Sequence, residues 1–290
     1  MTELTAPAPA KINLVLDILG KRPDGYHELR TVLQTLELAD RVVLRDSAAP
    51  IISVDGPCAA GVPADESNLA WRAMAELATL RGGGVPPKAI YIEKHVPAAA
   101  GLGGGASNAA TVLRLLQREW PDTPDDMLFE AANRIGSDEA FFLLGGTALA
   151  EGRGERVRQL DNLPPHDVVL FVPEATVEAK TAALFRAAGQ LPYDSGERSS
   201  RFLQRHPGRL TTDELWNSFE RVAFDVFPGL GELRAAITKA IGAEVRLAGA
   251  GPTLFWIGEA GRGEAIAAAA RGLHGCRIIT THTARSQWAR

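Results

Sequence analysis

The sequence predicts an α+β protein with two domains, and three observations support this prediction. The chain has 290 residues, which is more than a single domain usually contains. Strand-like and helix-like patterns are mixed along its length. Residues 162–166 (NLPPH) form a polar break with two prolines, and a new strand pattern follows it. We therefore expect domains at residues 1–165 and 166–290.

The first half contains both kinds of element. Short runs of β-branched residues bounded by Gly, Pro or Asp predict three strands, at 42–44, 51–54 and 90–92. Ser67 precedes apolar residues that recur at helical spacing as far as Leu77, so we expect a helix with Ser67 as its N-cap. A second apolar face predicts a helix from about Ser107 to Glu119.

The second half shows the same mixture. Its patterns predict strands at 168–172, 245–248, 253–257 and 277–283, and helices near 177–187, 213–219, 230–241 and 262–271. Residues 190–212 begin with the turn-forming sequence QLPYDSG, which is typical of a mobile loop. We therefore expect no regular element there.

Composition limits the function classes. The net charge of -4 lacks the basic excess of proteins that bind nucleic acid. No run approaches the roughly 18 apolar residues of a membrane span. Cys58 and Cys276 lie far apart without CxxC spacing, which argues against a disulfide framework or a zinc site. We expect a cytoplasmic protein, monomeric or homodimeric, with small-molecule partners.

A glycine-rich segment is the most informative feature. It follows a predicted strand and opens the predicted second helix. Its residues are Pro97, Ala98, Ala99, Ala100, Gly101, Leu102, Gly103, Gly104, Gly105, Ala106 and Ser107. Small residues let backbone N–H groups approach an anion, and the N-terminus of the following helix favours negative charge. The segment predicts a phosphate-binding loop, and the Ser107 hydroxyl suits Mg²⁺ or a phosphate oxygen.

Several nucleotide-binding classes use such loops. The Walker A pattern is absent, and so are the catalytic-loop and DFG sequences of protein kinases. Gly101, Gly103 and Ala106 satisfy a permissive dinucleotide fingerprint, but no strand ending in Asp or Glu follows about twenty residues later. The alternative without a ligand is a tight strand-to-helix turn. Four glycines within five positions argue against it.

The loop resembles the second motif of the GHMP small-molecule kinases, which include galactokinase, homoserine kinase, mevalonate kinase and phosphomevalonate kinase. Three segments carry the resemblance most specifically: PAKINL at 9–14, GKRPDGYHEL at 20–29 and GGGASNAA at 103–110. They resemble the members that act on a cytidine diphosphate-linked sugar alcohol. Shorter matches at 136–138, 145–148, 152–155 and 249–253 extend the resemblance over nearly the whole chain.

Two positions depart from the family pattern. Ala140 stands where the family has proline in GADxPFF, and Ala250 stands where its third motif has serine. Loss of the serine removes a hydroxyl near the expected phosphate region. We expect a modest effect on affinity.

The resemblance implies a two-domain GHMP kinase fold with ATP and substrate in the interdomain cleft. It implies that Asp138 is the base that accepts the hydroxyl proton, and that Lys11 holds both this carboxylate and the attacking oxygen. Without the resemblance, Asp138 would be interpreted as a helix cap and Lys11 as a solvated side chain. ATP and Mg²⁺ are the implied cofactors, with Mg²⁺ arriving on ATP.

Further residues are implied to bind the two ligands. For the substrate they are Asn13, Tyr26, His27 and Phe185, with His27 reading the cytosine edge and Phe185 either stacking on the ring or belonging to the core. For the nucleotide they are Asn68 and Lys94, in addition to the loop. Asn68 is equally explained as part of a helix start. The remaining histidines form no HExxH-like cluster, so a metal held by the protein itself is not indicated.

Two other functions are compatible with part of the pattern. A mevalonate- or homoserine-type kinase would keep the chemistry and change the substrate, but the sequence DGYHEL argues against it. A nucleotide-binding protein without activity would keep only the fold. A sensor of that kind has no need of a base near the γ-phosphate, so the presence of Lys11 and Asp138 favours an enzyme.

Overall fold

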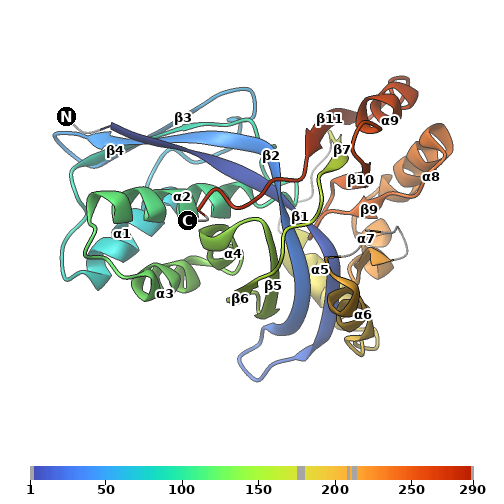
Figure 1. Ribbon diagram of the computed structural model, residues 1–290, viewed down its shortest axis with the longest axis horizontal. Coiled ribbons are helices and arrows are strands. Elements are labelled where there is room, and N and C mark those ends of the chain that lie inside the picture. Colours follow the sequence, from blue (N-terminus) through green and yellow to red (C-terminus); the bar gives the residue numbers. More distant parts are fainter. Residues whose placement is uncertain (1–2, 175–179, 208–209, 211–213, 289–290) are drawn as a thin grey trace.

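The computed structural model describes residues 3–174, 180–207, 210 and 214–288. It has an α+β architecture with two β-sheets, as predicted (Figure 1). The strands are β1 Glu3–Lys21, β2 His27–Asp46, β3 Ile51–Asp55, β4 Lys88–Glu93, β5 Thr147–Gly152, β6 Arg156–Gln159, β7 His166–Pro173, β8 Trp216–Asn217, β9 Arg246–Leu247, β10 Leu254–Glu259 and β11 Cys276–His282. The helices are α1 Leu69–Leu80, α2 Gly104–Glu119, α3 Asp125–Ile135, α4 Glu139–Leu144, α5 Lys180–Ala188, α6 Glu197–Arg205, α7 Glu220–Val226, α8 Leu230–Ile241 and α9 Gly263–Ala269.

The larger sheet has seven strands and is built around the long antiparallel hairpin of β1 and β2. Its order is β3-β4-β2-β1-β8, and β5 pairs with both β2 and β6. The β1–β2 register shifts at three places, and two of these shifts lie between Pro9 and Lys11 and between Asn13 and Val15. Such bulges bend a strand and re-aim its side chains, and they are frequent beside active sites. Both shifts lie next to residues that the sequence singles out.

Helices α1 to α4 lie on one side of this sheet (Figure 1). They bury a common core with β2 and β4, in which α2 is the central helix. From Ala106 to Leu113 every residue of α2 is buried, which explains the uninterrupted run of small and aliphatic residues there. Among the described residues, no helix combines the length and apolar composition that a membrane span needs.

The smaller sheet has four strands in the order β11-β7-β10-β9. The chain enters it at His166, directly after the proline-containing break. A domain boundary between residues 165 and 166 stays a proposal, because the chain crosses between the sheets more than once. Strand β8 joins the first sheet in parallel with β1.

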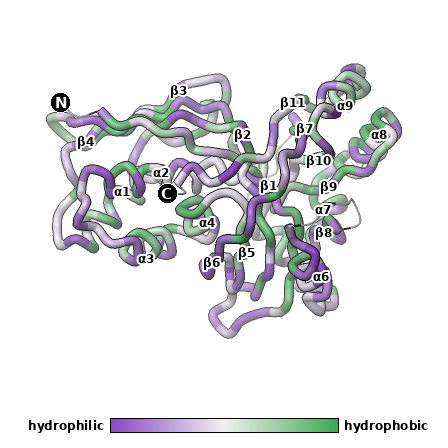
Figure 2. Tube along the Cα trace, viewed as in Figure 1, coloured by the Kyte–Doolittle hydropathy of each residue, from purple (hydrophilic) through white to green (hydrophobic). Residues whose placement is uncertain are grey.

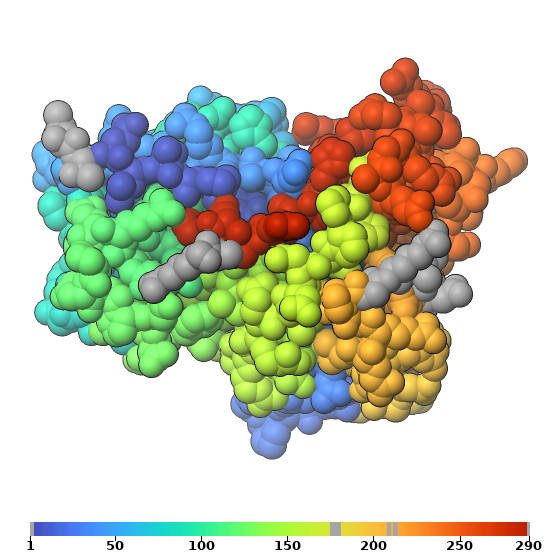
Figure 3. All heavy atoms as spheres, viewed as in Figure 1, coloured from blue at the N-terminus to red at the C-terminus, as the bar shows by residue number. Residues whose placement is uncertain are grey.

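The C-terminal segment also returns to the first sheet. The Ala284 amide donates to the Thr35 carbonyl at 2.9 Å, and the Trp288 indole N–H donates to the Phe142 carbonyl at 3.0 Å. Figure 3 shows this red segment between the blue N-terminal strands and the green helical region. Residues far apart in sequence therefore close one face of the molecule.

Two helix starts differ from the sequence prediction. Asn68, not Ser67, caps α1, because its side-chain oxygen accepts from the Ala70 amide at 2.9 Å. Helix α2 begins at Gly104, three residues before the predicted start at Ser107. Its N-cap residue, Gly103, has φ 74°, a conformation that glycine adopts without the steric cost other residues meet. The predicted start of α2 was wrong because it assumed a polar residue at the beginning of the helix, whereas glycine forms the turn into it.

Two predictions in the second half are wrong. Part of the predicted loop 190–212 forms α6, a helix that is mostly hydrophilic (Figure 2). It docks through buried Phe202 and through the Ser199 amide, which donates to the Asp17 carboxylate at 2.9 Å. Its polar sequence conceals this tertiary contact. Residues 208–209 and 211–212 lie outside the described residues.

The helix predicted at 213–219 is also absent from its described part, where β8 forms instead. Asn217 donates to the Leu247 carbonyl at 2.9 Å and to the Gly249 carbonyl at 2.7 Å. These bonds tie β8 to the second sheet. Residue 213 lies outside the described residues. The other predicted strands and helices are confirmed where the structure describes them, most of them to within a few residues, but the strand predicted at 42–44 is only part of the 20-residue β2.

A buried ion pair connects the first sheet to the start of α2. Lys94 and Asp40 are 2% and 1% exposed and form a hydrogen-bonded pair. The same carboxylate accepts from the His95 amide at 2.7 Å and the Val96 amide at 2.8 Å. It also accepts from the Asn108 side chain, on α2, at 2.9 Å. One carboxylate thus ties β2, the chain after β4, and α2 together.

We predict that Asp40→Ala lowers the free energy of unfolding by about 3 to 5 kcal/mol, because it leaves the Lys94 ammonium buried without its counterion. Denaturant titration of both proteins measures this. Glu93→Ala is the matched control, since it removes the carboxylate of the more exposed Arg41–Glu93 pair and should cost far less stability. Equal losses in the two variants would contradict the assigned role of Asp40.

Candidate active site

A cavity of about 740 Å³ lies between the first sheet with its helices and parts of the second half of the chain. This volume is within the range of small-molecule sites. The first sheet contributes Lys11, Asn13 and Thr31. The other walls come from the glycine-rich loop, the chain before α4, the turn after β5, helix α5, and the loop at Gly249 and Ala250. Walls from both halves of the chain agree with the expected interdomain cleft.

The glycine-rich loop has the backbone conformation of a tight cradle. Ala99, Gly101 and Gly103 have φ values of 51°, 84° and 74°. A Cβ atom at Gly101 would lie 2.5 Å from the Ala248 carbonyl oxygen, so only glycine permits this approach to the second sheet. The Lys11 amide donates to the Leu102 carbonyl at 2.9 Å, which joins the loop to β1.

The N-terminus of α2 opens onto the cavity. The first amide of the helix that has a partner within it is Ser107, which donates to the Gly103 carbonyl at 2.9 Å. The amides of Gly104, Gly105 and Ala106 precede it and are unsatisfied within the helix. The first turn carries no acidic residue. With the helix dipole, this is a preformed site for an anion such as phosphate.

Lys11 is buried and held by a chain of polar side chains. Its Nζ donates to Asn13 Oδ1 at 2.9 Å, and Asn13 Nδ2 donates to Thr31 Oγ1 at 2.8 Å. The Thr31 hydroxyl donates in turn to the Val15 carbonyl at 2.7 Å. Lys11 is only 4% exposed, so it is not the solvated lysine of the alternative interpretation. Asn13 therefore orients Lys11.

Asp138 lies close to Lys11 in the wall of the cavity. Its Oδ2 lies 3.5 Å from Lys11 Nζ, and its side chain is 42% exposed while that of Lys11 is 5% exposed. Asp138 occupies the N-cap position of α4, but its side chain makes no capping hydrogen bond. Because the carboxylate remains open to the cavity, it can accept a proton from a bound molecule. Helix α4 forms with Ala140 buried in place of the family's proline.

The loop at Gly249 closes over this pair. A Cβ atom there would lie 2.6 Å from Lys11 Nζ and 3.1 Å from Asn13 Oδ1. The backbone of the third motif therefore packs directly on the lysine. Ala250, which replaces the family's serine, borders the cavity, so the lost hydroxyl would have been at the site.

Glu139 is a further residue of the site, which no motif in the sequence indicated. It is 3% exposed and borders the cavity beside Asp138. Burial raises the pKa of Glu139 to about 7, and the charge of Asp138 adds to the effect, whereas Arg72 and Arg153 oppose it. The only signal in the sequence was a second acid directly after the aspartate, at the variable position of GADxPFF.

The tip of the β1–β2 hairpin carries Tyr26 and His27, as expected of the turn sequence. His27 stacks on Phe185, with ring centroids 4.8 Å apart and an interplanar angle of 18°. His27 Nε2 is buried and has no hydrogen-bond partner within the described residues. Phe185 borders the cavity, so it is not solely a core residue. Burial, and then the charge of Lys21, lowers the pKa of His27.

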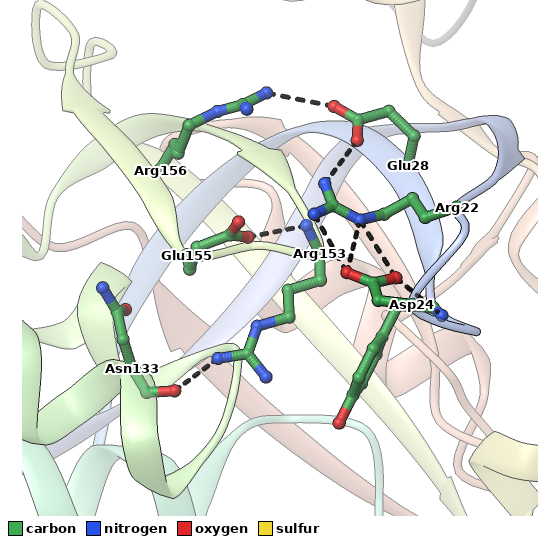
Figure 4. Close-up of polar contacts among 8 residues, drawn as sticks. Arg22, Asp24, Glu28, Asn133, Arg153, Glu155 and Arg156 are labelled. Atoms are coloured by element: carbon green, nitrogen blue, oxygen red, sulfur yellow. Dashed lines mark hydrogen bonds and ion pairs between the residues drawn. The ribbon is translucent and has the colours of Figure 1, made fainter.

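Charged side chains fix this tip (Figure 4). Arg22 donates to Glu28 at 2.7 Å, and Arg156 reaches the same carboxylate at 3.0 Å. The guanidinium of Arg153 lies over the ring of Tyr26, 5.3 Å from its centroid, and donates to the Asn133 carbonyl. The turn after β5 therefore holds the hairpin tip near α3. Tyr26 itself is 52% exposed.

Two of the predicted nucleotide-site residues, Lys94 and Asn68, have structural partners, whereas a third, Ser107, has none for its hydroxyl within the described residues. Lys94 borders the cavity, but its ammonium is bound to Asp40. Asn68 also borders it while its side chain caps α1. The Ser107 hydroxyl is fully buried and lacks a partner within the described residues. Lys94 and Asn68 therefore support the walls of the cavity in this structure.

Comparison with known proteins gives consistent results. Residues 68–146 match the family model described as the GHMP kinases N terminal domain. A 4-diphosphocytidyl-2-C-methyl-D-erythritol kinase of Dehalococcoides mccartyi is 41% identical over 87% of this chain and 88% of its own length. The kinase of that name from Pelotomaculum thermopropionicum is 40% identical over the same shares of the two chains.

Solved structures extend the comparison. A crystal structure of 4-(cytidine 5'-diphospho)-2C-methyl-D-erythritol kinase is 35% identical, covers 97% of this chain and 99% of its own, and has a TM-score of 0.75. A homoserine kinase from Cytophaga hutchinsonii covers 99% of this chain and 96% of its own, with a TM-score of 0.70 at 17% identity. The second likeness shows a shared fold.

We predict that Glu139→Gln stabilises the protein in a pH-dependent way. The folded protein holds this proton more tightly than the unfolded chain, so ionisation of Glu139 costs stability as the pH rises from 4.5 to about 7. The cost is absent well below pH 4.5 and reaches about 3 kcal/mol above pH 7. The variant's free energy of unfolding should therefore exceed that of the unmodified protein by the largest amount at pH 8.5.

Denaturant titrations at pH 5 and pH 8.5 measure the difference. Glu130→Gln, the same change at an exposed position of α3, should show no gain that grows with pH. A gain for Glu139→Gln of equal size at both pH values would contradict the raised pKa.

Proposed function

The chain belongs to the 4-diphosphocytidyl-2-C-methyl-D-erythritol kinase family, and we propose from this how its residues perform the reaction of that family. It is an ATP-dependent small-molecule kinase with the GHMP kinase fold. It transfers the γ-phosphoryl group of ATP to the 2-hydroxyl of 4-diphosphocytidyl-2-C-methyl-D-erythritol, giving the 2-phosphate and ADP. This is a step of the non-mevalonate pathway to isoprenoid precursors.

The proposed roles rest on the Lys11–Asp138 pair. It lies in the same cavity as the glycine-rich loop, with the carboxylate exposed and the ammonium buried. In this proposal the phosphates of ATP bind the free amides at the start of α2. The purine occupies the end bordered by Val62, Pro63 and Leu69, whose apolar side chains suit a flat ring.

Asp138 accepts the proton of the substrate hydroxyl while the oxygen of that hydroxyl attacks the γ-phosphorus. Lys11 keeps the carboxylate in place at 3.5 Å and offers its positive charge to the attacking oxygen and the transferring phosphoryl group. Asn13, bonded to both Lys11 and Thr31, prevents the lysine from turning away. The pair thus supplies the base and part of the charge stabilisation.

The cytosine ring is assigned to the hairpin tip. A neutral imidazole has one donor and one acceptor nitrogen, and burial of His27 favours this neutral form. That combination complements a base edge with an amino group and acceptor atoms. The free Nε2 of His27 is the observation that supports this role. Because His27 and Phe185 stack on each other, cytosine must share or replace that contact, with Tyr26 at the rim.

Mg²⁺ would be held mainly by the ATP phosphates. No group of three or more His, Cys, Asp or Glu residues in the described part of the chain could hold a metal ion. Bound there, the ion would neutralise developing charge on the phosphoryl oxygens. The buried Ser107 hydroxyl could contact it only after a change of the first turn of α2. We further propose a cytoplasmic enzyme, monomeric or homodimeric.

The direct test measures ADP release by the purified protein with Mg²⁺ and ATP. Three alcohols are supplied separately: 4-diphosphocytidyl-2-C-methyl-D-erythritol, mevalonate and homoserine. Turnover with the cytidylyl substrate alone, and a product heavier by one phosphoryl group, is the expected result. Preferential phosphorylation of mevalonate or homoserine would overturn the substrate assignment while leaving the fold intact.

We predict that Asp138→Asn lowers kcat by about 10²- to 10⁴-fold, because an amide cannot accept the hydroxyl proton. ATP binding should persist, since the phosphate-binding amides are unchanged. Steady-state kinetics and calorimetric titration of ATP check the two parts. Asp126→Asn, at an exposed position of α3, is the control and should retain activity. Full activity of Asp138→Asn would exclude this residue as the base.

A further inference from the structure

Glu139 has no role in the mechanism above, yet it is the most deeply buried acid of the cavity wall. Its carboxylate lies against the backbone of Gly136, where an added Cβ would be 2.4 Å from Oε2 and 2.6 Å from Oε1. Glu139 stands at the variable position of the family pattern GADxPFF. It follows Asp138 directly and borders the cavity with it.

The charges around Glu139 leave it without a close counterion. Arg72 and Arg153 favour its ionised form from a distance, and Asp138 disfavours it. No ion pair within 4.0 Å joins Glu139 to a basic side chain in the described residues. Arg153 is engaged with the Asn133 carbonyl and the ring of Tyr26.

Within the described residues, four other basic side chains of nearby elements face other groups. From α2, Arg114 donates to the Leu143 carbonyl at the opposite end of α4. From α3, Arg134 is paired with Glu76 and Glu130, and from β6, Arg156 is paired with Glu28. Lys11, from β1, faces Asp138.

We propose that Glu139 makes ATP binding proton-coupled: it takes up a proton when the triphosphate enters the cavity and releases it when the nucleotide leaves. This inference rests on the proposed function, because it places the phosphates of ATP beside Asp138. A buried carboxylate and a polyanion repel each other strongly in a cavity of low dielectric. Protonation of Glu139 removes that repulsion without moving any element of the fold.

The direction of the pH effect on ATP affinity follows from the linkage between proton binding and ATP binding. The free protein holds Glu139 with a pKa of about 7, so the group is partly protonated near neutral pH. A bound polyanion favours the protonated form and raises this pKa further. ATP affinity should therefore fall as the pH rises above 7, by up to about tenfold for each unit by which binding raises the pKa. Uptake should be on the order of half a proton per ATP at pH 7.5 if that rise is one unit.

The experiment is titration calorimetry of ATP with Mg²⁺ in two buffers of different ionisation enthalpy, at pH 7.5, without an alcohol substrate. The buffer dependence of the binding enthalpy gives the number of protons taken up. The terminal phosphate of the nucleotide also titrates near neutral pH, so the comparison between proteins carries the answer. The proteins are the unmodified chain, Glu139→Gln, Glu139→Leu and the exposed control Glu130→Gln.

The expected result is proton uptake in the unmodified protein and in Glu130→Gln that exceeds the uptake in both Glu139 variants. ATP affinity of the Glu139 variants should also depend less on pH between 6.5 and 8.5. Equal uptake in all four proteins, with ATP bound, would overturn this inference alone. Absence of ATP binding to the unmodified protein would overturn the proposed function and this inference with it. The leucine variant keeps the test decisive if glutamine disturbs the fold.

Discussion

The buried carboxylate of Asp40 is the interaction on which the geometry of the site depends. It binds the Lys94 ammonium, two successive backbone amides and the Asn108 side chain on α2. A charge removed from water at this depth is tolerated only when its hydrogen-bonding capacity is filled. The chain after β4 and the first turns of α2 are therefore held in one arrangement. The glycine-rich loop spans the short distance between these two held segments, which accounts for its sharp turns.

Close backbone contacts extend this constraint to Lys11 and its neighbours. Gly101 approaches the Ala248 carbonyl too closely for any side chain, and Gly249 packs in the same way on Lys11. The third motif from the second sheet and the loop from the first therefore close on each other around the lysine. Lys11 is then restrained by Asn13 and Asp138, so the carboxylate that we propose as the base, the ammonium and the unsatisfied amides at the start of α2 line one cavity. This is the preorganisation that phosphoryl transfer requires.

The acids of the site have different environments and, in our proposals, different tasks. Asp138 is open to the cavity and paired with Lys11, which suits a carboxylate that must be ionised to accept a proton. Glu139, one residue later, is buried without a close counterion, and its pKa rises to about 7. Burial and the presence or absence of a close counterion thus separate neighbouring residues of the same chemical type. A pattern of residue types cannot record this difference.

The sequence by itself determined the mixed α+β class, most element positions, the glycine-rich loop and the Lys11 and Asp138 candidates. These features depend on local periodicity, on glycine at positions of positive φ and on motifs that resemble a known family. Only the tertiary structure decided that α6 forms in a polar segment, that β8 replaces a helix at Trp216, and that Lys94 serves Asp40. It also decided that Glu139 is a buried acid of the site. These outcomes depend on burial and on partners distant in sequence, and neither is encoded in the local pattern of a single chain.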